Sequence, residues 1–250
     1  MKKRKFGIRM DGCEMPLEEL IKKHIPLIKK DVYTLIEIGS AGCTTLRAFS
    51  DILNENTPKW RAIGFDLPPE SAWSLDMNEI NAAFDNNPKI IREDDKLHDN
   101  VANCMGMNLV LLNDPRSYFK DGFPFQVDFA LIDGCHGACS GKDFEAIENI
   151  VSIGGLVAFH DYGVEETGTD WQHHCEEFIN VRTYVHRLGL AEPCNKKREG
   201  WRPVGEIPGS RKSGGDGNSC FVTQKISPPK NKSSASEVVN KFCKNLFVKN

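Results

Sequence analysis

The sequence predicts an α/β fold with a doubly wound parallel sheet and helices on both faces. Three observations support this. Short apolar runs of strand length recur between residues 33 and 159, segments with helical spacing lie between them, and an acidic residue stands at or near the end of each run. Strands that alternate with helices form parallel sheets, and such sheets bind ligands beyond the carboxyl ends of their strands.

The first predicted strand leads into a turn that contains glycine and then into a helix. The apolar run Tyr33 to Ile38 reads as a buried strand. Thr44 and Thr45 can start a helix, in which Leu46, Phe49 and Leu53 recur at helical spacing. Small residues in the turn allow a ligand to approach the backbone, and the helix N-terminus offers free amide donors.

The other elements follow in order along the chain. Further strands are expected at Arg61 to Leu67, Asn108 to Asn113, Val127 to Ile132 and Leu156 to Phe159. Helices are expected from Leu17 to Ile28, from Glu70 to Phe84 and from Lys142 to Ile150. The polar stretch Asp85 to Met107 carries no clear pattern, and we interpret it as an insertion near the edge of the expected ligand site.

Acidic residues mark the predicted carboxyl edge of the sheet. They are Glu37, Asp66, Asp114, Asp133 and Asp161. One acid at a strand end carries little information, but five at the same edge indicate a site. His160 directly precedes the last of them, and His136 follows Asp133 by three positions.

The turn after the first strand differs from a dinucleotide-binding turn. Dinucleotide folds use G-x-G-x-x-G, whereas Gly39 and Gly42 give G-x-x-G, with Glu37 two residues before the first glycine. A carboxylate there would repel a pyrophosphate but would tolerate a ligand with a cationic amino-acid part. The turn therefore favours S-adenosylmethionine, with an ordinary tight turn as the alternative.

This turn resembles the first motif of class I methyltransferases, roughly E-x-G-x-x-x-G-x-S/T-T, with one residue fewer between the glycines. The motifs I-D-G-C-H-G, K-D-F-E-A-I and G-G-L-V-A-F-H-D-Y, between Phe129 and Tyr162, are similar to those of the macrocin-type O-methyltransferase family and, more distantly, of catechol O-methyltransferases. The resemblance implies one Rossmann-like domain, mostly parallel with an antiparallel last strand. Trp201 to Ile207 and Ser219 to Lys225 would be its last two strands.

The resemblance also implies roles for individual residues. Glu37 and Gly39 would lie beside the methionine part of the cofactor, Asp66 would bind its ribose and Asp114 would lie near its adenine. Asp133 would bind a divalent metal or act as a base. The whole set expected to contact the cofactor is Glu37, Gly39, Ser40, Gly42, Thr44, Asp66, Asp114 and Asp133.

The predicted chemistry is transfer of a methyl group to a hydroxyl that must lose its proton. Asp133, His160 and His136 are the candidate catalytic residues, because a histidine or carboxylate can take that proton. Asp133, His160 and Asp161 are also the candidate ligands of Mg²⁺ or another divalent metal, which would lower the pKa of the hydroxyl. His160 departs from the all-oxygen ligand set typical of magnesium. Both routes remain open at this point.

Composition sets the limits of these predictions. The chain has 250 residues and a formal net charge of −3, so no overall charge favours nucleic acid. The 9 cysteines show no disulfide-like spacing, and with no signal peptide recognisable they read as reduced thiols of a cytoplasmic protein. No apolar run approaches the roughly 20 residues that span a bilayer.

Residues 1–226 are expected to form the methyltransferase domain with its N-terminal helix, and residues 227–250 a linker and an amphipathic C-terminal helix. That helix would pack on its own domain or on a second copy in a homo-oligomer. The expected partner is a small-molecule acceptor, such as a sugar or natural-product hydroxyl. A nucleic-acid methyltransferase and a non-catalytic cofactor-binding protein are the alternatives.

Overall fold

The computed structural model describes residues 14–70, 76–134, 139–162, 180–207 and 219–228. They form one eight-stranded sheet with helices packed against it. The strands are β1 (Tyr33–Ile38), β2 (Trp60–Asp66), β3 (Ile90–Arg92), β4 (Gly106–Leu111), β5 (Val127–Ile132), β6 (Val151–Phe159), β7 (Trp201–Ile207) and β8 (Cys220–Lys225). The helices are α1 (Glu14–His24), the 3-10 turn η1 (Ile25–Leu27), α2 (Thr44–Asn56), α3 (Met77–Ala83), α4 (Leu97–Ala102), α5 (Pro115–Asp121), α6 (Cys139–Ile147) and α7 (Val181–Arg187).

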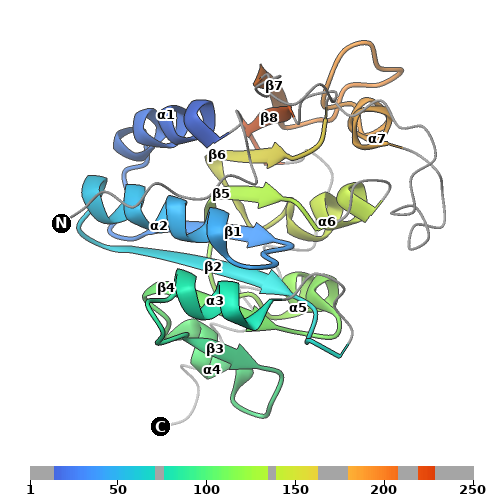
Figure 1. The fold of residues 1–250 in the computed structure, drawn as a ribbon. Helices are drawn as coiled ribbons and strands as arrows, with labels where there is room; N and C mark the ends of the chain where they lie inside the picture. The colour runs from blue at the N-terminus through green and yellow to red at the C-terminus, as the bar shows by residue number, and fades with distance from the viewer. Residues whose placement is uncertain (1–13, 71–75, 135–138, 163–179, 208–218, 229–250) are drawn as a thin grey trace, which may run out of the picture.

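The strand order is β3-β4-β2-β1-β5-β6-β8-β7, which Figure 1 shows from β3 near the bottom to β7 at the top. All pairings from β3 to β6 are parallel, whereas β8 pairs antiparallel with β6 and with β7. The order reverses on either side of β1, which is the position where doubly wound sheets bind ligands. The predicted fold class is therefore confirmed, including the antiparallel last strand.

Hydrophobic cores on the two faces of the sheet explain why these segments fold as they do. One core joins the sheet to α1, α2 and α3 through residues such as Leu46, Phe49 and Ile80. The other joins it to α4, α5, α6 and α7 through residues such as Phe144 and Val185. β1 and β5 are buried along their whole length, as expected for central parallel strands covered on both sides.

The structure changes the bounds of several predicted elements. β6 begins at Val151 rather than Leu156, because the bulge in its pairing with β5 lets the strand continue through two glycines. The helix expected from Glu70 to Phe84 is limited to α3 among the described residues, where the Asp76 side chain caps its start. The unassigned stretch Asp85 to Met107 contains β3 and α4 and ends in β4, so it extends the sheet at one edge.

The other edge of the sheet is β7. Its register with β8 shifts between Pro203 and Gly205, where Val204 is exposed. Among the helices of the described ranges, none combines the length and the hydrophobicity that a bilayer crossing requires. The predicted C-terminal helix lies in residues 229–250, outside the described residues.

Candidate functional site

The loops after β1 and β5 meet at the carboxyl edge of the sheet. Gly39 has a φ of +85°, and its N–H donates to the carbonyl of Phe65 over 2.8 Å. A Cβ on Gly39 would lie only 2.2 Å from the Cα of Gly134. Glycine is required here both for its positive φ and for this close approach of two backbones.

Glu37 lies inside β1 and is almost completely buried, with 1 % of its surface exposed. Its Oε2 atom has no hydrogen-bond partner among the described residues. Burial raises the pKa of Glu37 to about 8, and the nearby carboxylates of Asp133 and Asp66 add to that rise. A buried carboxyl without a partner is costly, so this position fits a ligand that brings a hydrogen-bond donor or a positive charge.

Ser40 gives a second buried polar atom without a partner. Its side chain is 5 % exposed, and its Oγ makes no hydrogen bond within the described part of the chain. A Cβ on Gly64 of β2 would lie 2.4 Å from this oxygen, so the glycine provides the space that the serine side chain occupies. Ser40 Oγ and Glu37 Oε2 are the orphaned atoms expected where a polar cofactor binds.

Asp66, at the end of β2, already holds the same turn. Its carboxylate accepts the N–H of Ala41 and the N–H of Leu67, each over 2.7 Å. Burial raises the pKa of Asp66, while these backbone hydrogen bonds lower it. Asp114 caps α5 by accepting the N–H of Ser117 over 3.1 Å. Each of these acids therefore has a structural role next to the sheet edge, besides the predicted role in cofactor binding.

The start of α2 completes the turn. Thr44 is its first residue, and Cys43 precedes it in the left-handed conformation with no side-chain cap. A Cβ on Gly42 would lie 2.1 Å from the Glu79 carboxylate, so this acid of α3 lies directly over the turn. Sequence reasoning missed Glu79, because it lies 42 positions after Glu37 in a helix whose docking the pattern does not reveal.

Asp133, His160 and Asp161 come together where β5 and β6 end. Ile132 pairs with Phe159 in the parallel register, so the next residues, Asp133 and His160, emerge side by side. The His160 N–H donates to the carbonyl of Ile132 over 3.0 Å, and the Asp133 N–H donates to the carbonyl of Ile38 over 2.8 Å. These bonds place the cluster next to the turn after β1.

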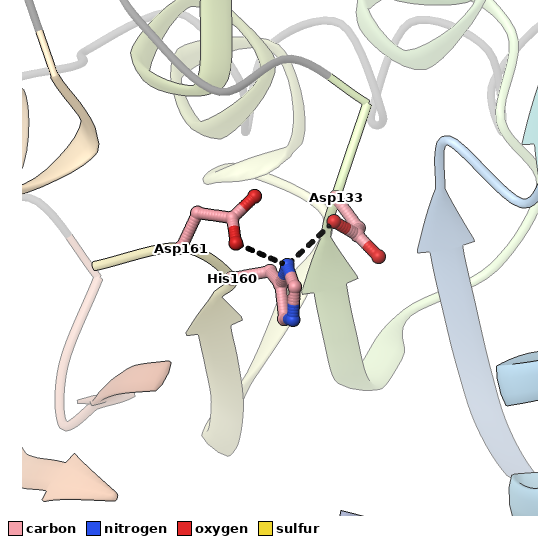
Figure 2. Close-up of side chains that lie close together, drawn as sticks. All are labelled: Asp133, His160 and Asp161. Atoms are coloured by element: carbon pink, nitrogen blue, oxygen red, sulfur yellow. Dashed lines mark ion pairs between the residues drawn. The ribbon is translucent and has the colours of Figure 1, made fainter. Parts of the chain in front are cut away.

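Figure 2 shows the His160 ring between the two carboxylates. Its Nδ1 lies 2.8 Å from Oδ1 of Asp133 and 3.1 Å from Oδ1 of Asp161. Neither ring nitrogen has a partner with hydrogen-bond geometry in the described residues. Burial alone would lower the pKa of His160, but the two carboxylates outweigh it and raise the pKa well above its usual value. The cluster therefore attracts a positive charge, either a proton or a cation.

The same three residues also suit a metal ion. Each offers one ligand atom, and these atoms all lie within 4.8 Å of one another. Two carboxylates with one imidazole form a mixed oxygen and nitrogen set, which suits Mn²⁺, Fe²⁺ or Zn²⁺ better than Mg²⁺. The residues fit a divalent ion, and they fit a metal-free acid–base group as well.

The structure thus brings together most of the predicted site residues. Glu37, Gly39, Ser40 and Asp66 surround the turn, and Asp133 joins it to His160 and Asp161. The hydrogen bond from the Asp133 N–H to the carbonyl of Ile38 and the close approach of Gly39 to Gly134 place the turn after β1 and the cluster side by side. His136 lies outside the described residues.

Comparisons with known proteins agree with this geometry. A family model described as a methyltransferase domain matches residues 36–162, from β1 to the end of the cluster. No curated protein matches the sequence.

Two solved structures share the fold. Cofactor-bound Rv0187 from MTB has a TM-score of 0.55 at 10 % identity, over 88 % of this chain and 84 % of that one. The O-methyltransferase TomG from Streptomyces achromogenes, involved in tomaymycin synthesis and solved in complex with SAM, has a TM-score of 0.51 at 10 % identity. That match covers 86 % of this chain and 79 % of TomG. At such identities these two structures are evidence for the fold alone.

Proposed function

The chain belongs to the methyltransferase-domain family and is an S-adenosylmethionine-dependent methyltransferase, and from this premise we propose that it methylates the hydroxyl group of a small molecule. One observation carries the proposal. The acid–histidine cluster of Asp133, His160 and Asp161 lies directly beside the turn after β1, close to Glu37, whose buried Oε2 atom has no partner among the described residues. A group that can remove a hydroxyl proton therefore adjoins the place proposed for the methyl donor.

The proposed cofactor contacts follow from the orphaned atoms. Glu37 would accept the ammonium group of the methionine part, which supplies the positive charge that this buried carboxyl lacks. Ser40 Oγ would form a hydrogen bond with the same part of the cofactor. The carboxylate of Asp66 accepts one N–H from the turn, that of Ala41, and one from its neighbour Leu67, which leaves acceptor capacity for ribose hydroxyls. The cofactor would also contact the backbone of Gly39, Gly42 and Thr44.

The cluster would prepare the acceptor. We propose that Asp133, His160 and Asp161 hold a divalent ion, since their ligand atoms converge without forming aligned hydrogen bonds to His160. A bound ion would orient the hydroxyl and lower its pKa. Without an ion, His160 or Asp133 would take the proton directly, as general base.

The proposed methyl transfer needs only the cofactor, the acceptor hydroxyl and one base. Bound S-adenosylmethionine supplies a methyl group on a sulfonium, which is already a good electrophile. A bond would form from the acceptor oxygen to the methyl carbon while the carbon–sulfur bond breaks, and the electron pair would stay on the sulfur. The hydroxyl proton would pass to the base at the cluster, His160 or Asp133. The residues of the chain contribute mainly by aligning oxygen and methyl carbon, the effect that brings most of the rate in such transfers.

A screen of sugars, phenols and natural-product hydroxyls with methyl-labelled S-adenosylmethionine tests this function. We expect label in at least one of these classes and its loss in Asp133→Ala. Calorimetry with S-adenosylmethionine separates an enzyme without a matching acceptor from a protein that does not bind the cofactor. Label transfer to RNA or DNA instead of to small molecules would contradict the proposal.

A further inference from the structure

Asp161 has a left-handed backbone conformation. Its φ is +55°, in a region that most residues other than glycine avoid, although aspartate and asparagine enter it more often than others. Its side chain is buried, and its Oδ1 lies 3.1 Å from Nδ1 of His160. Such a conformation is strained and persists only where the surroundings fix it. The next residue in the chain provides that fixation.

Tyr162 is held on both its backbone and its ring. Its N–H donates to the carbonyl of Ser219 over 2.9 Å. Its ring stacks on Phe221 of β8, with centroids 5.0 Å apart and an interplanar angle of 28°. With 4 % of its surface exposed, Tyr162 has little room to move. The chain direction immediately after Asp161 is therefore set by β8.

The hydroxyl of Tyr162 reaches across to α7. It lies 3.0 Å from Nε2 of His186, and Nδ1 of the same ring lies 3.0 Å from the carbonyl oxygen of Pro193. A carbonyl oxygen only accepts, so Nδ1 must carry the hydrogen. In the neutral ring Nε2 then accepts, and the tyrosine hydroxyl donates to it. In the neutral ring, the direction of both hydrogen bonds is thus determined.

Glu206 of β7 contacts two of the residues that hold Tyr162. Its carboxylate accepts from Oγ of Ser219 over 2.8 Å and pairs with Arg182 of α7 over 3.2 Å. The Arg182 guanidinium carbon lies 5.0 Å from the centroid of the Tyr162 ring. Glu206 therefore fixes both the residue that binds the Tyr162 backbone and the residue that covers its ring.

We propose that Tyr162 is a positioning residue for the reaction. Its hydroxyl, held by His186, keeps Asp161 in the left-handed conformation in which the carboxylate meets His160. The link to catalysis rests on the proposed function of the cluster, but the positioning itself can be measured without any acceptor or metal.

The test follows the ring nitrogens of His160 by NMR in protein with ¹⁵N-labelled histidine, at one pH and with chelator present. Asp161→Ala defines the signal of His160 when the carboxylate is lost. We expect Tyr162→Phe, which removes only the hydroxyl, to move the His160 signals toward that reference. His186→Ala should move them similarly, and the double variant should add little, because both changes break one interaction.

Tyr118→Phe is the matched control. Tyr118 is also buried, but its hydroxyl has no partner among the described residues, so its loss should leave His160 unchanged. Wild-type signals from His160 in folded Tyr162→Phe and His186→Ala would overturn the proposal. Once an acceptor is known, kcat of Tyr162→Phe should fall about tenfold or more at unchanged affinity for S-adenosylmethionine. Failure to find any acceptor would count against the proposed function and leave the NMR result standing.

Discussion

Gly39 and Gly134 approach so closely that a Cβ on the first would lie 2.2 Å from the Cα of the second. The contact joins the loop after β1, which is the turn proposed to bind the cofactor, to the loop after β5, which carries Asp133. No flexible side chain is present to yield, because the overlap is with backbone atoms. The packing of these two loops therefore depends on glycine.

Gly39→Ala should destabilise the protein more than Gly154→Ala. The two glycines have nearly equal φ angles, +85° and +88°, so the conformational cost of alanine is similar. A Cβ on Gly154 would meet only the end of Ile28, at 3.9 Å. The overlap at Gly39 should therefore lower the free energy of unfolding by about 1–3 kcal/mol more in Gly39→Ala than in Gly154→Ala. Urea unfolding of both variants measures the difference, and equal losses would contradict this account.

Glu37→Gln should weaken binding of S-adenosylmethionine by more than about tenfold, which corresponds to roughly 1.4 kcal/mol. The substitution keeps the shape of the side chain and removes the negative charge that would face the ammonium group. Glu55→Gln is the matched control, because Glu55 is an exposed residue of α2. Calorimetric titration gives both affinities. If Glu37→Gln bound as tightly as the control, Glu37 would not contact the cation.

The stability of the ligand-free protein should depend on the charge state of Glu37. The pKa is about 8 in the folded state and 4.5 in the reference state, so folding favours the protonated form. This contribution is fully present below pH 4.5 and is lost as the pH rises through 8. As the pH rises from 4.5 to about 8, the free energy of unfolding should therefore fall less for Glu37→Gln than for wild type. Urea unfolding at several pH values, with chelator present, tests this, and parallel curves would refute it.

Chelation separates the two versions of the chemical step. With a known acceptor, EDTA should abolish activity, and Mn²⁺ should restore it better than Mg²⁺. The reason is that the ligand atoms of Asp133, His160 and Asp161 converge for one ion. Full activity in EDTA together with its loss in His160→Ala would support the general base instead. Full activity in Asp133→Ala would exclude the metal version and would exclude Asp133 as the base.

The sequence predicts the sheet and its acidic edge because parallel strands impose simple rules. β1 and β5 are buried apolar runs, and their predicted bounds agree with the structure residue for residue. Consecutive strand ends fall at one edge, which is why Asp133 and His160 could be expected together. Short elements lack such a signal. β3 has only three residues and forms by pairing with β4, so its own sequence does not reveal it.

Side-chain partners across the fold were not predictable in the same way. Asp66 was expected at a ribose, and the structure adds its hydrogen bond from Ala41 of the turn, which depends on how β2 meets that loop. Tyr162 and His186 lie 24 positions apart, and only the packing of α7 brings them together. Contacts of this kind arise from tertiary geometry, whereas the strand-end acids follow from periodicity and direction.

The register shift in β7 affects how readily copies of this molecule can pair edge to edge. An edge strand carries a row of free N–H and C=O groups to which another chain can add. Pro203 has no N–H to offer, and the irregularity between Pro203 and Gly205 breaks the spacing of that row. At the opposite edge, β3 is too short to template a long pairing. Both margins of the sheet are thereby protected against strand-by-strand aggregation.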